Sequence, residues 1–202
     1  MTICRFLLLP LIALLLSVGC RKSPEGKAKS PVVAKSSGGA HASIETDKGV
    51  IEIEFLEKDS PRAVENFRLL AERGYFNGLT FHRIVKGFMI QGGDPAGDGS
   101  GGESAWGGTF PDELKRDSEL YRAGYRRGLV AMANAGPDTN GSQFFILHQD
   151  YRLGPNYVIF GKVVQGMAAV DALAETPTTR GGDGGMSQPI TPPVMRKVTV
   201  RP

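Results

Sequence analysis

The chain has 202 residues, of which 41% are hydrophobic and 22% are charged, with 24 Lys and Arg against 21 Asp and Glu. These proportions are ordinary for a soluble globular protein, and the length suits one domain with an additional tail. The charges are dispersed and no basic run is interleaved with aromatic residues, which argues against nucleic acid as a partner. The three histidines and two cysteines show no zinc-binding spacing, so we expect neither a metal nor a cofactor.

The first twenty residues have the pattern of an export signal. Arg5 precedes an apolar run over 6–16, which is too short for a comfortable membrane span and leads into small residues and Cys20. Residues 16–20, Leu-Ser-Val-Gly-Cys, resemble a bacterial lipoprotein cleavage site, after which the cysteine becomes the lipidated first residue. Ser17 departs from that pattern, since a leucine usually stands there. We expect a signal peptide over 1–19 and lipidation at Cys20; the alternatives are an ordinary secreted protein with a free cysteine or an uncleaved anchor.

Residues 20–40 connect this signal to the rest of the chain. They are rich in Lys, Ser, Pro, Gly and Ala and have few large apolar residues, which predicts a flexible tether after the lipidated cysteine. Both cysteines, Cys4 and Cys20, precede the remaining domain, which must therefore be stable without a disulfide. This organisation predicts a protein of the bacterial cell envelope, anchored to the membrane by lipid and facing the periplasm or the exterior.

A single folded domain is expected over 41–202. Ile44 precedes turn residues at 46–49, and the alternation over 50–55 predicts a β-hairpin. Ser60 is placed to cap a helix that has Pro61 in its first turn and ends at Gly74.

The remainder of the domain predicts short strands and one more helix. The strands are expected near 79–85, 88–92, 128–133, 143–147, 157–164 and 194–200, and the helix near 167–174. Many short strands with two helices favour a mainly β fold, a closed β-barrel whose ends the helices cover.

Residues 81–94, Phe-His-Arg-Ile-Val-Lys-Gly-Phe-Met-Ile-Gln-Gly-Gly-Asp, place an arginine in an apolar, strand-like segment. Residues of equal parity share one face of a strand, so Phe81, Arg83 and Val85 are expected on the same side. The same rule groups Phe88 and Ile90. Arginine is costly among apolar neighbours unless its donors have something to bind, which marks this segment as functional.

A second run over 132–146, Met-Ala-Asn-Ala-Gly-Pro-Asp-Thr-Asn-Gly-Ser-Gln-Phe-Phe-Ile, adds small residues, amides and aromatics. Together the two runs resemble the cyclophilin family of peptidyl-prolyl cis-trans isomerases, and the resemblance extends over about 44–200. It implies a closed eight-stranded antiparallel β-barrel capped by two α-helices. It also implies a monomer that acts on proline-containing unfolded or partly folded polypeptides and uses no cofactor.

Isomerisation of an X-Pro bond requires rotation past a barrier of about 18–20 kcal/mol, set by amide resonance. The twisted prolyl nitrogen regains a lone pair, to which a guanidinium can donate a hydrogen bond that is absent in the ground state. The resemblance assigns this role to Arg83 and completes the catalytic set with Phe88 and Gln91. The competing interpretation of Arg83 is an ordinary surface residue of an edge strand.

The resemblance also implies the substrate-binding positions, which are Met89, Ala133, Asn134, Ala135, Gln143, Phe145, Leu153 and Tyr157. The apolar members, with Phe88, match a pocket for the proline ring, although apolar strand residues are more often core. Gln91 and Gln143 match positions that hold substrate or orient the arginine; Gln143 could instead cap backbone groups. The residues 133–135 match a backbone rail along which the substrate pairs.

Two positions depart from the best-known members of the family. A tryptophan usually precedes the residue matching Leu153, and a histidine usually stands at Tyr157; here both are absent. We therefore expect weak binding of cyclosporin but retained catalysis. Elsewhere in the motif region, His82 is expected to make a structural hydrogen bond, and Asp94 and Asp98 to be turn residues.

Three functions compete on the sequence. The first is an active isomerase that assists the folding of exported polypeptides. The second is a proline-peptide-binding or chaperone module that uses the groove without catalysis, and the third is a structural envelope protein. Arg83 favours the enzyme, because a binding module would not need a guanidinium at the reacting bond, and a structural protein would not need the groove.

Overall fold

The computed structural model describes residues 40–201. The predicted signal peptide, the lipidation site Cys20 and the tether up to residue 39 lie outside the described residues. Over 40–201 the element order is that of a mainly β domain with few helices. Among its helices, none has the length and apolar character needed to cross a membrane.

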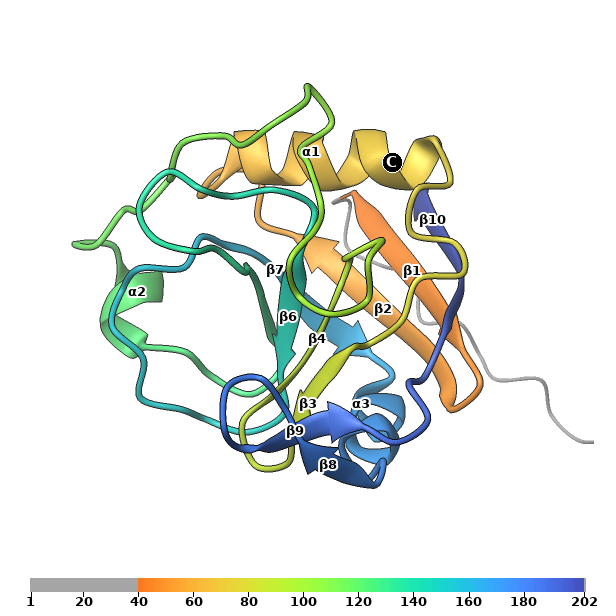
Figure 1. Cartoon of the computed structure of the whole chain (residues 1–202). Coiled ribbons are helices and arrows are strands. Elements are labelled where there is room, and N and C mark those ends of the chain that lie inside the picture. The colour runs from red at the N-terminus through yellow and green to blue at the C-terminus, as the bar shows by residue number, and fades with distance from the viewer. Residues whose placement is uncertain (1–39, 202) are drawn as a thin grey trace, which may run out of the picture. The chain divides into compact units, whose positions relative to one another are not determined.

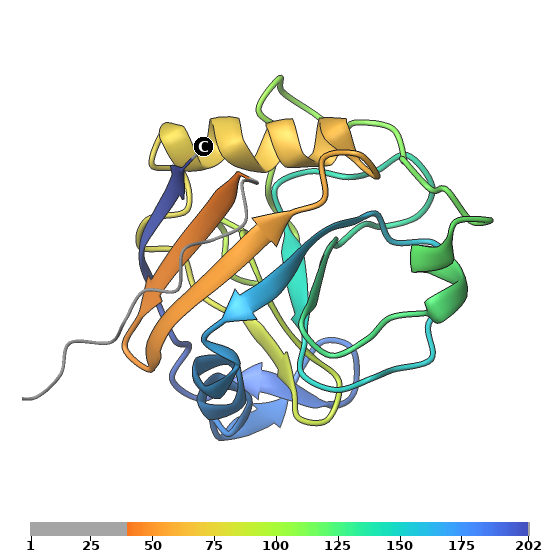
Figure 2. The same cartoon turned by 180° about the vertical axis from the view of Figure 1, so that it is seen from behind.

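Eight strands form one curled antiparallel sheet (Figures 1 and 2). The strands are β1 His41–Thr46, β2 Gly49–Phe55, β3 Arg83–Val85, β4 Met89–Gly92, β5 Leu129–Met132, β6 Phe144–Leu147, β7 Ile159–Gln165 and β10 Met195–Arg201. Their order across the sheet is β10-β1-β2-β7-β5-β6-β4-β3. Every predicted strand is present, and the strands near 79–85 and 157–164 are shorter than expected.

The expected closed barrel is not formed, because the edge strands β3 and β10 are not paired with each other. The segments that precede these strands share one isolated bridge, between Thr80 and Val194. Phe81 and His82, which lie between this bridge and β3, belong to no strand. The result is an open half-barrel of eight strands.

The core lies inside this curl and is dominated by aromatic side chains. The Phe67 ring has its centroid 4.7 Å from that of Phe76, 5.3 Å from that of Phe144 and 5.4 Å from that of Phe160. Phe67 belongs to α1 (Pro61–Glu72), which lies across one end of the sheet, and α3 (Met167–Ala174) lies at the other end (Figure 1). Both predicted helices are thus confirmed, and they cover the open ends of the curl.

The N-terminus of α1 is capped differently from the prediction. The Ser60 hydroxyl makes no cap; it is buried and donates to the carbonyl of Ile159 at 2.8 Å. The Glu113 carboxylate instead accepts from the backbone N–H groups of Arg62 at 3.0 Å and Ala63 at 2.8 Å. A carboxylate satisfies these donors and complements the helix dipole, and it comes from a residue fifty positions away that no local pattern indicates.

The parity prediction for the 81–94 segment holds for Arg83 and Val85 but is wrong for Phe81 and Phe88. Phe81 is fully buried in the main core with Ile84 and Ile90, whereas Arg83 and Val85 lie outside that cluster. Phe88 precedes β4 in the turn and packs away from the main core, so it does not share a side with Ile90. Strict alternation fails because only 83–85 and 89–92 are extended strands.

One helix and one two-stranded hairpin were not predicted. The short helix α2 (Glu119–Ala123) begins after Ser118, whose side chain accepts from the Tyr121 backbone N–H. Strands β8 (Thr178–Arg180) and β9 (Met186–Pro189) pair with each other as a separate two-stranded sheet. This second hairpin lies beside β3 (Figure 1), and it therefore borders the segment that carries Arg83.

Candidate active site

A groove of about 670 Å³ contains most of the predicted site residues. Strands β3, β4 and β6 are adjacent, and their register places Arg83 opposite Gln91 and Gln91 opposite Phe145. The predicted residues that line the groove are Arg83, Phe88, Met89, Gln91, Ala133, Asn134, Phe145, Leu153 and Tyr157. Ala135 and Gln143 do not line it.

The apolar part of the groove is a cluster separate from the main core. Met89 is 1% exposed and Phe145 is 4% exposed, and Phe88, Leu153 and Tyr157 pack against them. The rings of Phe145 and Tyr157 meet edge to face at 5.5 Å and 86°. These residues thus form an apolar, aromatic-walled part of the groove, which is the kind of environment that suits a proline ring.

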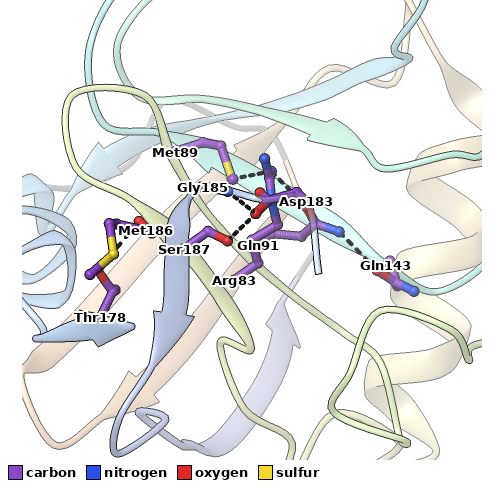
Figure 3. A network of polar contacts seen from close by, with 9 residues as sticks. All are labelled: Arg83, Met89, Gln91, Gln143, Thr178, Asp183, Gly185, Met186 and Ser187. Carbon is purple, nitrogen blue, oxygen red and sulfur yellow. Dashed lines mark hydrogen bonds and ion pairs between the residues drawn. The ribbon is translucent and has the colours of Figure 1, made fainter. Parts of the chain in front are cut away.

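A chain of polar side chains links β3, β4 and the segment before β6 (Figure 3). Arg83 Nη1 donates to Gln91 Oε1 at 3.4 Å, and Gln91 Nε2 donates to Gln143 Oε1 at 2.9 Å. Gln143 Nε2 in turn donates to the carbonyls of Gly99 at 2.9 Å and Gly101 at 2.8 Å. Gln143 therefore both caps backbone groups of the glycine-rich loop and orients Gln91, which contacts the arginine.

The predicted backbone rail over 133–135 is partly engaged by the chain itself. The Ala133 N–H donates to the Gln143 carbonyl at 3.0 Å, and the Ala135 N–H donates to Thr139 Oγ1 at 2.8 Å. The Asn134 side chain donates to the Asn156 carbonyl at 2.9 Å, which joins this segment to the one carrying Tyr157. Ala135 is exposed outside the groove, so its amide contributes to the shape of the loop.

The comparisons with known proteins decide the family. Residues 41–200 match the model of the family described as cyclophilin type peptidyl-prolyl cis-trans isomerase/CLD. The chain belongs to this family. It is 50% identical over 136 residues to peptidyl-prolyl cis-trans isomerase-like 1 of Mus musculus, covering 67% of this chain and 80% of that protein. A longer relative, isomerase CYP65 of Arabidopsis thaliana, is 49% identical over 138 residues, covering 68% of this chain but 22% of its own length.

A solved structure supports the same family assignment. The crystal structure of a cyclophilin type isomerase from Cryptosporidium parvum, in the presence of the dipeptide Ala-Pro, has a TM-score of 0.72 and 36% identity. The similarity covers 80% of this chain and 99% of that one. The protein is thus a cyclophilin peptidyl-prolyl cis-trans isomerase, and the family acts on proline-containing polypeptides.

The wall of the cyclophilin groove at Tyr157 is held by two buried tyrosines. The Tyr125 hydroxyl donates to the Tyr157 carbonyl at 2.9 Å and accepts from the Tyr157 N–H at 3.0 Å. The Tyr121 hydroxyl donates to the same carbonyl at 3.3 Å and accepts from the Ile159 N–H at 3.0 Å. Burial raises the pKa of Tyr121, and it raises the pKa of Tyr125 to about 12. Both hydroxyl protons therefore stay in place at ordinary pH.

His82 differs from its prediction. It is 6% exposed at the edge of the groove, and neither ring nitrogen has a hydrogen-bond partner. Burial is the main cause that lowers its pKa, followed by the opposing influence of the Asp94 carboxylate. Asp94 accepts from the backbone N–H groups of Ala96, Asp98 and Gly99, so its predicted role as a turn residue is confirmed.

The hairpin β8–β9 supplies groove residues that sequence reasoning missed. They are Gly181, Gly182, Asp183, Ser187 and Gln188. Asp183 Oδ2 accepts from Arg83 Nε at 2.8 Å, across a separation of 100 residues. No motif indicates this pairing, because Asp183 lies in a turn whose other residues over 181–185 are all glycines. Over residues 40–201 no group of His, Cys, Asp and Glu side chains is arranged to hold a metal ion.

Proposed function

We propose that Arg83, Phe88 and Gln91 form the catalytic set of this isomerase. The guanidinium donates to the prolyl nitrogen as the amide twists, and the Phe88–Phe145 pocket holds the proline ring. The observation that carries this assignment is the placement of Arg83 beside a buried aromatic pocket, with its Nη1 group held by Gln91. The bond to the twisted nitrogen exists only near the transition state, so its contribution falls on the rate.

The test is Arg83→Ala, with Arg126→Ala as the control. A hydrogen bond from a charged donor contributes roughly 1.5–3 kcal/mol, so we expect kcat to fall by about one to two orders of magnitude. Arg126 forms an ion pair with Asp150 in which both side chains are more than half exposed, and its loss should leave the rate unchanged. A folded Arg83→Ala variant with the wild-type rate would contradict the assignment and favour a peptide-binding or chaperone module.

The physiological substrates that we propose are exported polypeptides in a bacterial envelope. Support comes from the N-terminal sequence alone: an apolar run over 6–16 that ends in small residues and Cys20, then a polar stretch. A monomer lipidated at Cys20 would stand on a tether of about twenty residues, whose mean span is roughly 25 Å. That distance holds the groove close enough to the membrane to meet emerging chains during slow proline-limited folding.

Cys20→Ser tests the anchor. The variant should move from the membrane fraction to the soluble fraction while its isomerase rate is unchanged. Mass spectrometry of the mature N-terminus should find a lipidated cysteine in the wild-type protein. An unmodified Cys20, or cleavage elsewhere, would contradict the anchor and leave the enzyme assignment intact.

A further inference from the structure

The Arg83 guanidinium is held from two directions. Nε donates to Asp183 Oδ2 at 2.8 Å, and Nη1 contacts Gln91 Oε1 at 3.4 Å (Figure 3). Among the described residues, neither hydrogen of Nη2 has a partner. A guanidinium is a planar group with five donors in a rigid fork, so two anchored edges define the direction of the remaining one. That remaining edge is available to a substrate in the groove.

Asp183 is itself held by its own hairpin. Its second oxygen, Oδ1, accepts from the Ser187 hydroxyl at 2.6 Å and from the Gly185 N–H at 3.0 Å. These bonds, with the Arg83 guanidinium, lower the pKa of Asp183 to about 2. The carboxylate is therefore ionised and oriented before any substrate arrives, and its two oxygens are divided between the hairpin and the arginine.

We propose that Asp183 is a positioning residue for the isomerase reaction, and that the β8–β9 hairpin orients the Arg83 guanidinium toward the prolyl nitrogen. The proposal rests on the catalytic role assigned to Arg83. A long arginine side chain has many rotamers in an open groove, and each unproductive rotamer lowers the population able to donate. Because Asp183 acts through Arg83 and contacts no reacting atom, its loss should lower kcat and leave KM unchanged.

Asp183→Asn separates this role from a purely structural one. Asparagine has the same size, and its Oδ1 can still accept from Ser187 and Gly185, so the hairpin keeps its own bonds. Its NH₂ group would face Arg83 Nε and cannot accept from it. The control is Glu175→Gln, which removes the exposed Lys86–Glu175 ion pair near the start of the same hairpin without touching the arginine.

NMR exchange measurements on a proline-containing peptide, with the full chain, give kcat and KM separately. The side chains of the Arg83–Asp183 ion pair are each about one third exposed, and solvent screening limits the strength of the pair. We therefore expect Asp183→Asn to lower kcat about tenfold and to leave KM unchanged. The Glu175→Gln control should keep the wild-type kcat and KM. In a spectrum of ¹⁵N-labelled protein, the Arg83 Nε–H signal should be protected from solvent exchange in the wild type and lose that protection in Asp183→Asn.

Combining the two changes tests the route of the effect. If Asp183 acts through Arg83, adding Asp183→Asn to Arg83→Ala should lower kcat no further. A wild-type kcat in Asp183→Asn, a rise in kcat, or a change confined to KM would each overturn the positioning role. If Arg83→Ala is impaired and Asp183→Asn is normal, only this inference fails; a normal Arg83→Ala variant removes the proposed role of Arg83 as well.

Discussion

Replacing Tyr125 by phenylalanine should loosen the groove wall that carries Tyr157. The change deletes one hydroxyl, which both donates to the Tyr157 carbonyl and accepts from the Tyr157 N–H. The carbonyl keeps its longer bond from Tyr121, whereas the N–H loses its hydroxyl acceptor. Each net hydrogen bond contributes about 1 kcal/mol, so we expect the free energy of unfolding to fall by about 2 kcal/mol. In a domain of this size that corresponds to about 4–8 °C in Tm.

Urea denaturation of the wild type and two variants measures this loss. Tyr151→Phe is the matched control, because Tyr151 is 46% exposed and its hydroxyl has no partner among the described residues. Tyr125→Phe should also raise KM a few-fold, since Tyr157 lines the groove, with a smaller change in kcat. If Tyr125→Phe is as stable as Tyr151→Phe, the hydroxyl does not hold the wall and the reasoning is refuted.

Three further outcomes are expected. Gly166→Ala should lower the free energy of unfolding by more than about 2 kcal/mol, because Gly166 has a φ of 91° and a Cβ would collide with the Val50 carbonyl oxygen. The control is Gly78→Ala, at a positive-φ position in open space, for which denaturation should show a smaller loss. His82→Phe should remove a pH dependence of stability. The pKa of His82 in the folded state lies below its unfolded value of about 6.5, so the wild type loses stability as the pH falls through that value. Denaturation of both proteins at pH 7 and pH 5 tests this. Titrating cyclosporin against activity should show weak inhibition, because no tryptophan stands in the segment directly before Leu153. Nanomolar inhibition would contradict this.

Much of the site followed from local sequence. The Phe81–Asp94 and Met132–Ile146 runs indicated the family, and nine of the eleven predicted catalytic and substrate-binding residues line one groove. The strands and the two longer helices followed from apolar periodicity, because each buries one face against the same core. Local pattern failed where the chain leaves regular structure, as at Phe81 and Phe88, which precede strands and do not obey their alternation.

The sequence by itself determined the family of this protein and the residue types along its groove: an arginine within an apolar segment, with amides and aromatics in the two motif runs. Only the tertiary structure decided which groups hold those residues in place. Three such contacts join residues that lie 32 to 100 positions apart in the sequence: Glu113 with the start of α1, Tyr125 with Tyr157, and Asp183 with Arg83. Such pairs depend on side-chain directions after the sheet has curled, and a single polar residue in a loop carries no periodic signal of its distant partner.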